Sequence, residues 1–292
     1  MGAEIFRNEA KRHSEKSILI MIKAVFFDLD GTLLNSKKEM DDSTKAALKE
    51  CKKHGIKLFA ATARPPILDK MLGWDKEEFG LFNGGLYCNG GCRKIGSKAF
   101  YTYIPQNIVS VCINEVSKYN SLNIALQMEN EIHAFNNPLA DFAYQAWGID
   151  KKDAVEITEE CKSKAIKLLI YYENIIDTVT PLPKDLVNHL NQQCNAGAKL
   201  YLTDNGRVMQ ITSKEAGKYN GIESIRKQLD LDKSEVAVFG DDTNDLEMLG
   251  GYEASVAMGN ADEAVKRTAK FVTKSNDDNG IAFALKEILQ II

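Results

Sequence analysis

Short apolar runs alternate along the outer parts of the chain with segments whose apolar residues recur every three or four positions. Near the N-terminus, "IKAVFF" precedes a helical pattern from Thr44 to His54, and "IKLFAAT" follows it. Continuous apolar runs are typical of strands buried on both faces of a parallel sheet. We therefore predict a strand–helix–strand unit here, with Asp42 or Ser43 as the helix cap.

The C-terminal part repeats this alternation. Helical patterns run from about Lys218 to Leu229, from Asn244 and from Ala261, and "GIAFALKEIL" forms a last one. The apolar runs "VAVF", "ASVAM" and "KFVT" lie between them. Strands that alternate with helices predict an α/β fold, a doubly wound parallel sheet with helices on both faces.

The middle of the chain has a different pattern. Strand-like runs fold back at Glu129-Asn130 and Asn205-Gly206 in the manner of β-hairpins. This pattern predicts an α+β domain inserted into the α/β core, with the glycine-rich "FNGGLYCNGG" around Asn83 as a hinge. The predicted parts are an N-terminal extension (1–20), a core (21–84 and 213–292) and the inserted domain (85–212).

Composition narrows the class of protein. The 292 residues, 44% hydrophobic and 27% charged, suggest a soluble chain of about two domains. Because the formal charge is −4 and no basic stripe is present, we expect no nucleic-acid partner. Six scattered cysteines indicate reduced thiols and a cytoplasmic location.

The first apolar stretch is interrupted by Lys23 and is too short for a membrane span. Cys88 and Cys92 have a spacing that zinc sites use, but no matching second pair follows.

Two carboxylates end the first apolar run. In "FFDLDGTLL", Asp28 and Asp30 are two positions apart and share a face of an extended segment, at the carboxyl end of a buried strand. Gly31 allows a tight turn that leaves N–H groups for an anion. A strand-ending turn explains one Asp more easily than two. An EF-hand calcium loop that begins at Asp28 is another explanation of the two carboxylates, but such a loop would need Gly at the position of Leu33.

A second acidic cluster, "FGDDTNDLEML", follows the strand "VAVF". Asp241 lies in the loop, while Asn244 and Asp245 fall in the first helical turn. Helix capping is an alternative explanation for Asp242 and Thr243. Oxygen-rich loops without His or Cys, at the ends of neighbouring strands, supply the ligands that Mg²⁺ prefers.

Three further residues fit a phosphoryl group. Thr62 and Ala63 lie in "ATAR" at another strand end, and Lys218 opens a helix. A cation, a hydroxyl and loop N–H groups neutralise the negative phosphoryl oxygens before a carboxylate attacks. Taken singly, Lys218 would be read as a solvated surface lysine and Thr62 as a turn residue.

Together, "DLDGTLL", "ATAR", the lysine of "GKYNG" and "GDDTNDLEML" resemble the four ordered motifs of the haloacid dehalogenase (HAD) superfamily of phosphatases. The closing stretch from "SVAMGN" resembles its Cof-type branch, type IIB, in which an α+β cap is inserted between the second and third motifs. The resemblance implies a Rossmann-like core with a C2-type cap. It departs from the family at Ala63, where the second motif usually has Gly.

The resemblance also assigns roles. Asp28 would be the nucleophile that forms an aspartyl-phosphate, and Asp30 the acid that protonates the leaving oxygen and then activates water. Two adjacent carboxylates do not both ionise easily, so we expect Asp30 to keep a proton. The implied Mg²⁺ ligands are Asp28, the Asp30 main-chain carbonyl and Asp241, with Asp245 in support. The implied phosphate contacts are Leu29, Thr62, Ala63, Lys218 and Asn244.

The sequence thus predicts a Mg²⁺-dependent phosphomonoester hydrolase acting on small phosphorylated metabolites, sugar phosphates foremost. One alternative is a phosphosugar mutase, which returns the phosphoryl group to the sugar. Another is a phospho-receiver or ligand-binding module that is phosphorylated on Asp28 without turnover. The motifs specify neither the substrate nor the oligomeric state.

Overall fold

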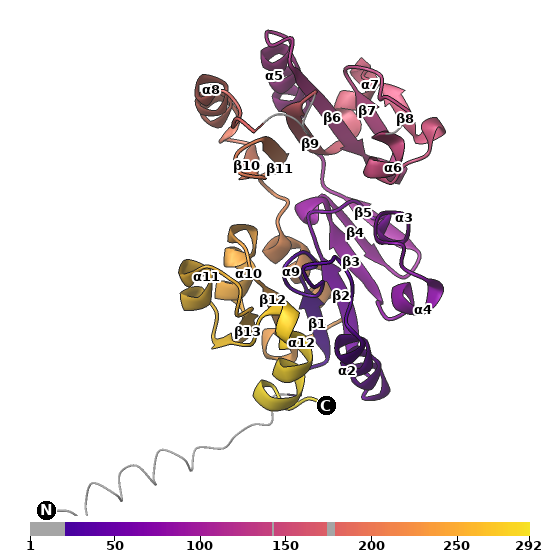
Figure 1. Cartoon of the computed structure of the whole chain (residues 1–292), viewed down its shortest axis with the longest axis vertical. Helices are drawn as coiled ribbons and strands as arrows, with labels where there is room; N and C mark the ends of the chain where they lie inside the picture. The colour runs from indigo at the N-terminus through magenta and orange to yellow at the C-terminus, as the bar shows by residue number, and fades with distance from the viewer. Residues whose placement is uncertain (1–20, 142, 174–178) are drawn as a thin grey trace, which may run out of the picture.

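The computed structural model describes residues 21–141, 143–173 and 179–292. The predicted N-terminal extension over residues 1–20 lies outside the described residues. Two sheet-centred bodies are stacked along the long axis of the molecule, and two stretches of chain join them (Figure 1). The lower body contains both ends of the described sequence, so the upper body is an insertion.

The lower body, the core, is built on a sheet in which eight strands are described, in the order β14-β13-β12-β1-β2-β3-β4-β5. The strands from β14 to β3 are parallel, and β4 and β5 continue the sheet as antiparallel strands. Their bounds are β1 (Ala24–Phe27), β2 (Lys57–Ala61), β3 (Gly84–Tyr87), β4 (Cys92–Ile95), β5 (Lys98–Tyr101), β12 (Val236–Gly240), β13 (Ala254–Ala257) and β14 (Phe271–Val272).

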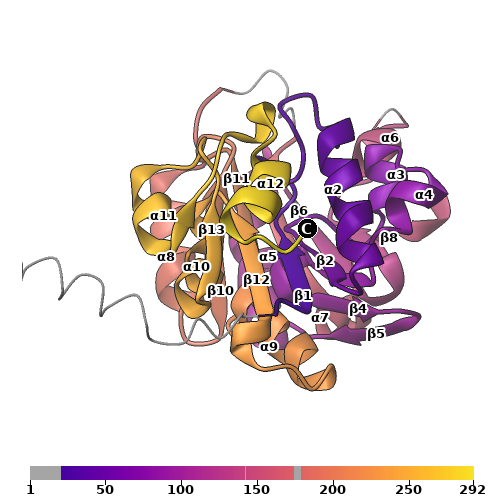
Figure 2. The same cartoon turned by 90° about the horizontal axis from the view of Figure 1, so that it is seen from below.

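Helices cover both faces of this sheet, as predicted. On β1, Val25 and Phe27 pack into one apolar cluster with α2 and α12, while Ala24 and Phe26 pack into another with α9, α10 and α11. Figure 2 shows α2 and α12 on one side of the sheet and α9 on the other. The core helices are α2 (Asp42–Lys53), α3 (Leu68–Leu72), α4 (Lys76–Phe79), α9 (Lys218–Gln228), α10 (Leu246–Gly251), α11 (Glu263–Thr268) and α12 (Gly280–Phe283).

The cap of α2 differs from the prediction by one residue. Asp41, not Asp42 or Ser43, is the N-cap, because Asp41 has extended backbone angles and the helix begins at the next residue. The Asp41 carboxylate accepts a hydrogen bond from Asn35 Nδ2 at 2.8 Å and does not cap the helix N–H groups.

The upper body, the cap, is built on a sheet in which six strands are described, in the order β10-β11-β9-β6-β7-β8. Its strands are antiparallel except for β7 and β8, and the predicted hairpins β6–β7 and β10–β11 are present. Its elements are α5 (Gln106–Val116), β6 (Leu122–Met128), β7 (His133–Phe135), α6 (Ala143–Trp147), β8 (Ala154–Glu156), α7 (Glu159–Lys164), β9 (Ala165–Tyr172), α8 (Lys184–Cys194), β10 (Ala198–Thr203) and β11 (Val208–Ser213).

Short turns of helix complete the described elements: η1 (Cys88–Gly90), η2 (Glu129–Glu131), η3 (Lys151–Asp153), η4 (Lys233–Glu235), η5 (Thr243–Asp245), η6 (Asn276–Asp278) and a π-type turn η7 (Ala284–Ile288). Within the described ranges, no helix is long and apolar enough to span a bilayer.

The sheet topology corrects the expected domain boundary at residue 84 and the expected hinge around Asn83. β3 pairs with β2 in parallel register, with Gly84 opposite Phe59, and β4 and β5 extend the same sheet to Tyr101. The strand pattern of this segment is the same whether it joins the core sheet or the cap sheet, so the sequence did not separate the two. We propose instead a core of residues 21–101 and 214–292 and a cap of residues 102–213.

The cap is seated on the core through both apolar and charged contacts. One face of its sheet is covered by α5, α7 and α8. From the other face, Phe135 and Tyr171 form a cluster with Ile67 of the core. On the opposite side of the interface, Lys199 Nζ of β10 lies 2.7 Å from Glu247 of α10. The cap thus covers the edge of the core sheet where the strands end.

Candidate active site

The predicted acidic residues meet at the carboxyl edge of the core sheet. Asp28 directly follows β1, Thr62 follows β2 and Asp241 follows β12, three neighbouring parallel strands. Parallel strands end at the same edge, so residues far apart in the chain become neighbours. Carboxylate oxygens of Asp28, Asp241 and Asp245 lie within 4.8 Å of one another.

The turn after Asp28 requires glycine. Gly31 has a φ of +86°, and a Cβ at this position would lie 2.8 Å from Cγ of Asp241. Only glycine therefore combines this backbone conformation with the close approach of Asp241. The next residue, Thr32, is 1% exposed, and its hydroxyl donates to Asp241 Oδ1 at 2.6 Å. Sequence reasoning missed Thr32, although its hydroxyl directly follows the predicted glycine turn.

A buried lysine bridges two of the carboxylates. Lys218 Nζ lies 2.5 Å from Asp28 Oδ1 and 2.6 Å from Asp245 Oδ1, and the lysine side chain is 1% exposed. Interpreting it as a solvated surface lysine is therefore wrong. The other oxygen of Asp245 accepts the backbone N–H groups of Asp241 and Asp242 at 3.0 and 3.1 Å. Asp245 thus fixes the loop that carries Asp241.

The cluster has an excess of negative charge. Burial raises the pKa of Asp28 well above its ordinary value, Asp245 and Asp241 raise it further, and Lys218 opposes them. Burial also raises the pKa of Asp241 to about 6. One ammonium does not neutralise three carboxylates. An oxygen-only, electronegative group of this kind fits a hard divalent cation such as Mg²⁺.

Asp30 is held differently. Its carboxylate forms a two-point ion pair with Arg64, with Nε and Nη2 each 2.7 Å from one oxygen, and Lys38 Nζ lies 2.8 Å away. Burial acts to raise the pKa of Asp30, but Arg64 and Lys38 outweigh it and lower the pKa to about 2. The expectation that Asp30 keeps a proton is wrong for this arrangement. Asp28 is the carboxyl whose pKa is raised.

The predicted phosphate contacts present polar groups at the same edge. In the described chain, no protein acceptor is found for the backbone N–H groups of Leu29 and Ala63, which follow β1 and β2. Ala63 has no left-handed backbone conformation, so this departure from glycine is accommodated. Thr62 is buried, and Asn244 lies in η5 beside the acidic loop. Unpaired N–H groups beside an ammonium can donate hydrogen bonds to a bound anion.

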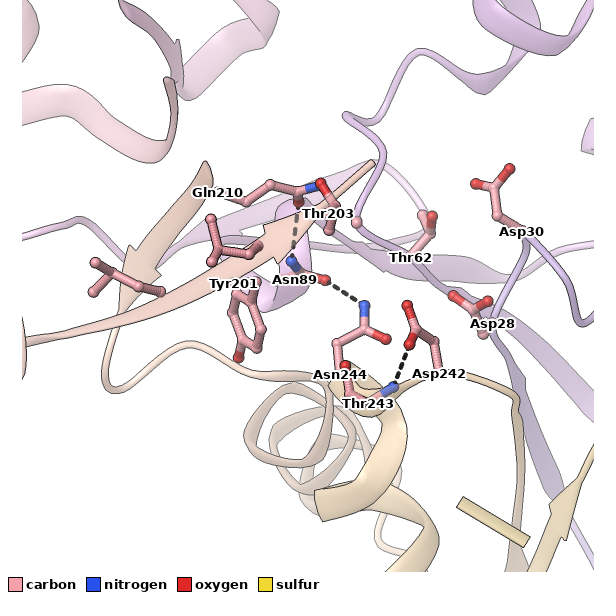
Figure 3. Close-up of a pocket in the computed structure, with 13 residues that line it drawn as sticks. Asp28, Asp30, Thr62, Asn89, Tyr201, Thr203, Gln210, Asp242, Thr243 and Asn244 are labelled. Atoms are coloured by element: carbon pink, nitrogen blue, oxygen red, sulfur yellow. Dashed lines mark hydrogen bonds between the residues drawn. The ribbon is translucent and has the colours of Figure 1, made fainter. Parts of the chain in front are cut away.

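A cavity of about 350 Å³ opens between core and cap above these groups. Figure 3 shows Asp28, Thr62 and Asp242 on the core side, and Tyr201 and Gln210 on the cap side. The core residues that line it are Asp28, Asp30, Thr62, Ala63, Asn89, Asp242, Thr243 and Asn244, and the cap residues are Leu200, Tyr201, Leu202, Thr203 and Gln210.

A chain of amides links the two walls of this cavity (Figure 3). Asn244 Nδ2 donates to Asn89 Oδ1 at 3.2 Å, and Asn89 Nδ2 donates to Gln210 Oε1 at 3.5 Å. Gln210 in turn donates to the Thr203 hydroxyl at 3.1 Å. Sequence reasoning did not predict Asn89, Gln210 or Thr203, because they belong to no motif and become neighbours only when the cap is seated.

A doubly wound core, an inserted cap and an acidic site at the strand ends define a class of hydrolases. The sequence model of the haloacid dehalogenase-like hydrolase family matches residues 25–285, and the chain belongs to this family. Together with the relatives below, this match makes the chain a Cof-type phosphatase.

Two curated relatives are from Bacillus subtilis. Phosphatase YwpJ is 26% identical over 298 residues, with 92% of this chain and 100% of that protein covered. The 5-amino-6-(5-phospho-D-ribitylamino)uracil phosphatase YitU is 24% identical, with coverage of 91% and 97%. Among solved structures, the HAD subclass IIB sugar phosphatase BT4131 matches with a TM-score of 0.75 at 25% identity, over 92% of this chain and 100% of that one.

Proposed function

We propose that this phosphatase hydrolyses small phosphomonoesters, sugar phosphates foremost, with Mg²⁺ and through an aspartyl-phosphate on Asp28. The observation that carries the proposal is the placement of the Asp28 carboxylate. It lines the cavity at the end of β1, beside the buried ammonium of Lys218 and the unpaired N–H groups of Leu29 and Ala63. A carboxylate so placed has an anion-binding surface around the position of an incoming phosphoryl group.

The residues present fit Mg²⁺ because the donors are all oxygen and the carboxylates outnumber the one ammonium. Asp28, Asp241 and the Asp30 main-chain carbonyl would hold the cation, with Asp245 in support. When bound, the cation neutralises phosphoryl oxygens and lowers the repulsion between the ester and an anionic nucleophile.

The chain's own residues supply the remaining steps. A carboxylate oxygen of Asp28 attacks phosphorus, the ester P–O bond breaks, and Asp30 gives its proton to the leaving oxygen. Asp30 then takes a proton from water, which attacks phosphorus and releases Asp28. Lys218, Thr62 and Asn244 hold the phosphate oxygens. Because Arg64 stabilises the anionic form of Asp30, Asp30 has to leave Arg64 and take up a proton from solvent before it can act as an acid.

The cap side of the cavity favours a hydroxylated leaving group. Tyr201, Thr203 and Gln210 present hydroxyl and amide groups, and none of the described cap residues that line the cavity is cationic. Neutral hydrogen-bonding groups suit neutral hydroxyls better than a second phosphate or a carboxylate. The names of BT4131, a sugar phosphatase, and of YitU, which acts on a phosphoribityl compound, support the same substrate class.

The test is turnover of p-nitrophenyl phosphate and a panel of phosphorylated metabolites, with Mg²⁺ or with chelator. We expect free phosphate to be released with Mg²⁺ alone. Asp28→Asn should abolish turnover in a protein that remains folded, while Asp69→Asn, in a core helix away from the cluster, should leave turnover intact. Equal turnover in chelator contradicts the metal requirement. Isomerised sugar phosphate without free phosphate indicates a mutase, and a stable phosphoenzyme indicates a receiver.

A further inference from the structure

A lysine of the cap reaches the phosphate-binding edge of the core. Lys167 lies on β9 and is 3% exposed, and its Nζ donates to the main-chain carbonyl of Ala63 at 2.7 Å. Tyr171, four residues along the same strand, packs against Ile67 of the core, so this face of β9 is turned toward the core. The contact exists only while the cap is seated.

The carbonyl that Lys167 binds belongs to a peptide group held at both ends. The N–H of the same peptide is that of Arg64, which donates to Thr62 Oγ1 at 3.1 Å. The Thr62 hydroxyl therefore accepts from the backbone and keeps its own hydrogen for another acceptor, such as a phosphate oxygen. Lys167 thus fixes the orientation of the turn at residues 62–64, which carries both Thr62 and the free N–H of Ala63.

No described carboxylate forms an ion pair with Lys167. Burial lowers its pKa to about 8, Arg64 and Lys218 lower it as well, and the thiol of Cys88 acts in the other direction. A buried ammonium without a carboxylate partner is unfavourable unless something else offsets its charge. Arg64 and Lys218 are themselves paired with carboxylates. A phosphate dianion in the cavity would supply the negative charge that Lys167 lacks.

We propose that Lys167 is a positioning residue of the cap, which orients the 62–64 turn for phosphate and completes the phosphate site only when the cap is seated. The inference rests on the proposed function of this site, but it concerns a side chain of the cap that belongs to none of the four motifs. It predicts that phosphate affinity depends on a residue outside the cavity wall.

The competing explanation is that Lys167 only attaches the cap to the core, and Lys199 provides a matched control for it. Lys199 lies opposite Thr212, and Thr212 lies opposite Lys167, so both lysines share one face and one row of the cap sheet. Lys199 also bridges cap and core, through Glu247 of α10, but it does not contact the 62–64 turn.

The experiment measures binding of inorganic phosphate by phosphorus NMR titration in the presence of Mg²⁺, alongside turnover of p-nitrophenyl phosphate. Lys167→Met should weaken phosphate binding and lower kcat/KM by about 10- to 100-fold, the usual effect of losing a hydrogen bond to a charged group. Lys199→Met should change both by less than about threefold. Lys167→Arg, which keeps a cationic donor, should recover most of the binding.

Equal effects of Lys167→Met and Lys199→Met would overturn the inference in favour of cap attachment, and unchanged phosphate binding in Lys167→Met would overturn it outright. If Lys167→Met does not fold, Lys167→Gln, which removes the charge, has to weaken phosphate binding by more than Lys199→Met does. A wild type that binds phosphate with this Lys167 dependence but turns over nothing refutes the proposed hydrolase alone. A wild type that does not bind phosphate refutes the inference as well.

Discussion

Lys218→Met removes the ammonium that separates Asp28 from Asp245. All three side chains are at most 8% exposed, so water does not replace the lost charge. Breaking a buried ion pair by removing one partner destabilises a protein by about 3–5 kcal/mol, since the remaining charges stay buried. We expect a loss of this size in the free energy of unfolding, measured in chelator so that no divalent cation compensates.

The loss should depend on pH in a defined direction. The folded-state pKa of Asp28 is raised above its unfolded value, so the folded protein binds more protons in the window between the two values, and stability falls as pH rises through it. Lys218 acts to lower this pKa, so its removal widens the window. Each unit by which the pKa of Asp28 rises relieves about 1.4 kcal/mol of the loss at low pH.

Urea unfolding of wild type and Lys218→Met at pH 5 and pH 8 tests this reasoning. The difference in the free energy of unfolding should be larger at pH 8, where more of Asp28 is ionised, than at pH 5. Lys49→Met is the control, because Lys49 forms an exposed ion pair with Glu77, and removing it should change the free energy by less than about 1 kcal/mol. A Lys218→Met effect no larger than that of Lys49→Met, or one independent of pH, would refute the reasoning.

Three further predictions concern the same edge of the sheet. Gly31→Ala should lower the free energy of unfolding by about 1–3 kcal/mol and weaken Mg²⁺ binding in calorimetry, since the added Cβ meets Asp241. Gly55→Ala, where φ is +77° and the space is open, should leave Mg²⁺ binding unchanged. Equal Mg²⁺ affinities of the two variants contradict this prediction. Mg²⁺ should raise the melting temperature more at pH 8 than at pH 5, because protons compete for Asp241, whose pKa is about 6; a larger rise at pH 5 contradicts it. Arg64→Gln should move the pKa of Asp30 up from about 2 toward its ordinary value in carboxyl-carbon NMR, and an unmoved pKa would show that Arg64 does not control it.

Much of the site could be predicted from local sequence. A buried parallel strand is a continuous apolar run, so the carboxylate that ends "AVFF" has to lie at the carboxyl edge of the sheet. The same argument applies to Thr62 after β2 and to Asp241 after β12. Gly31 was predicted as a turn residue, and its positive φ confirms that interpretation.

Other features could not be predicted, because they depend on packing between distant segments. The partner of Asp30 is Arg64, and this ion pair reversed the expected order of the two carboxyl pKa values. The strand pattern of the segment after residue 84 is compatible with either sheet. Only its pairing with β2 shows that the segment belongs to the core sheet. The amide chain through Asn89 and Gln210 forms across two bodies.

The sequence by itself determined the chemistry at the strand ends, because strand burial and glycine turns are local properties that place Asp28, Thr62 and Asp241 at one edge. Only the tertiary structure decided which charges face one another there. The contact of Lys167 with Ala63 joins residues 104 positions apart, and long-range electrostatics and the seating of the cap, neither of which has a local signature, bring them together.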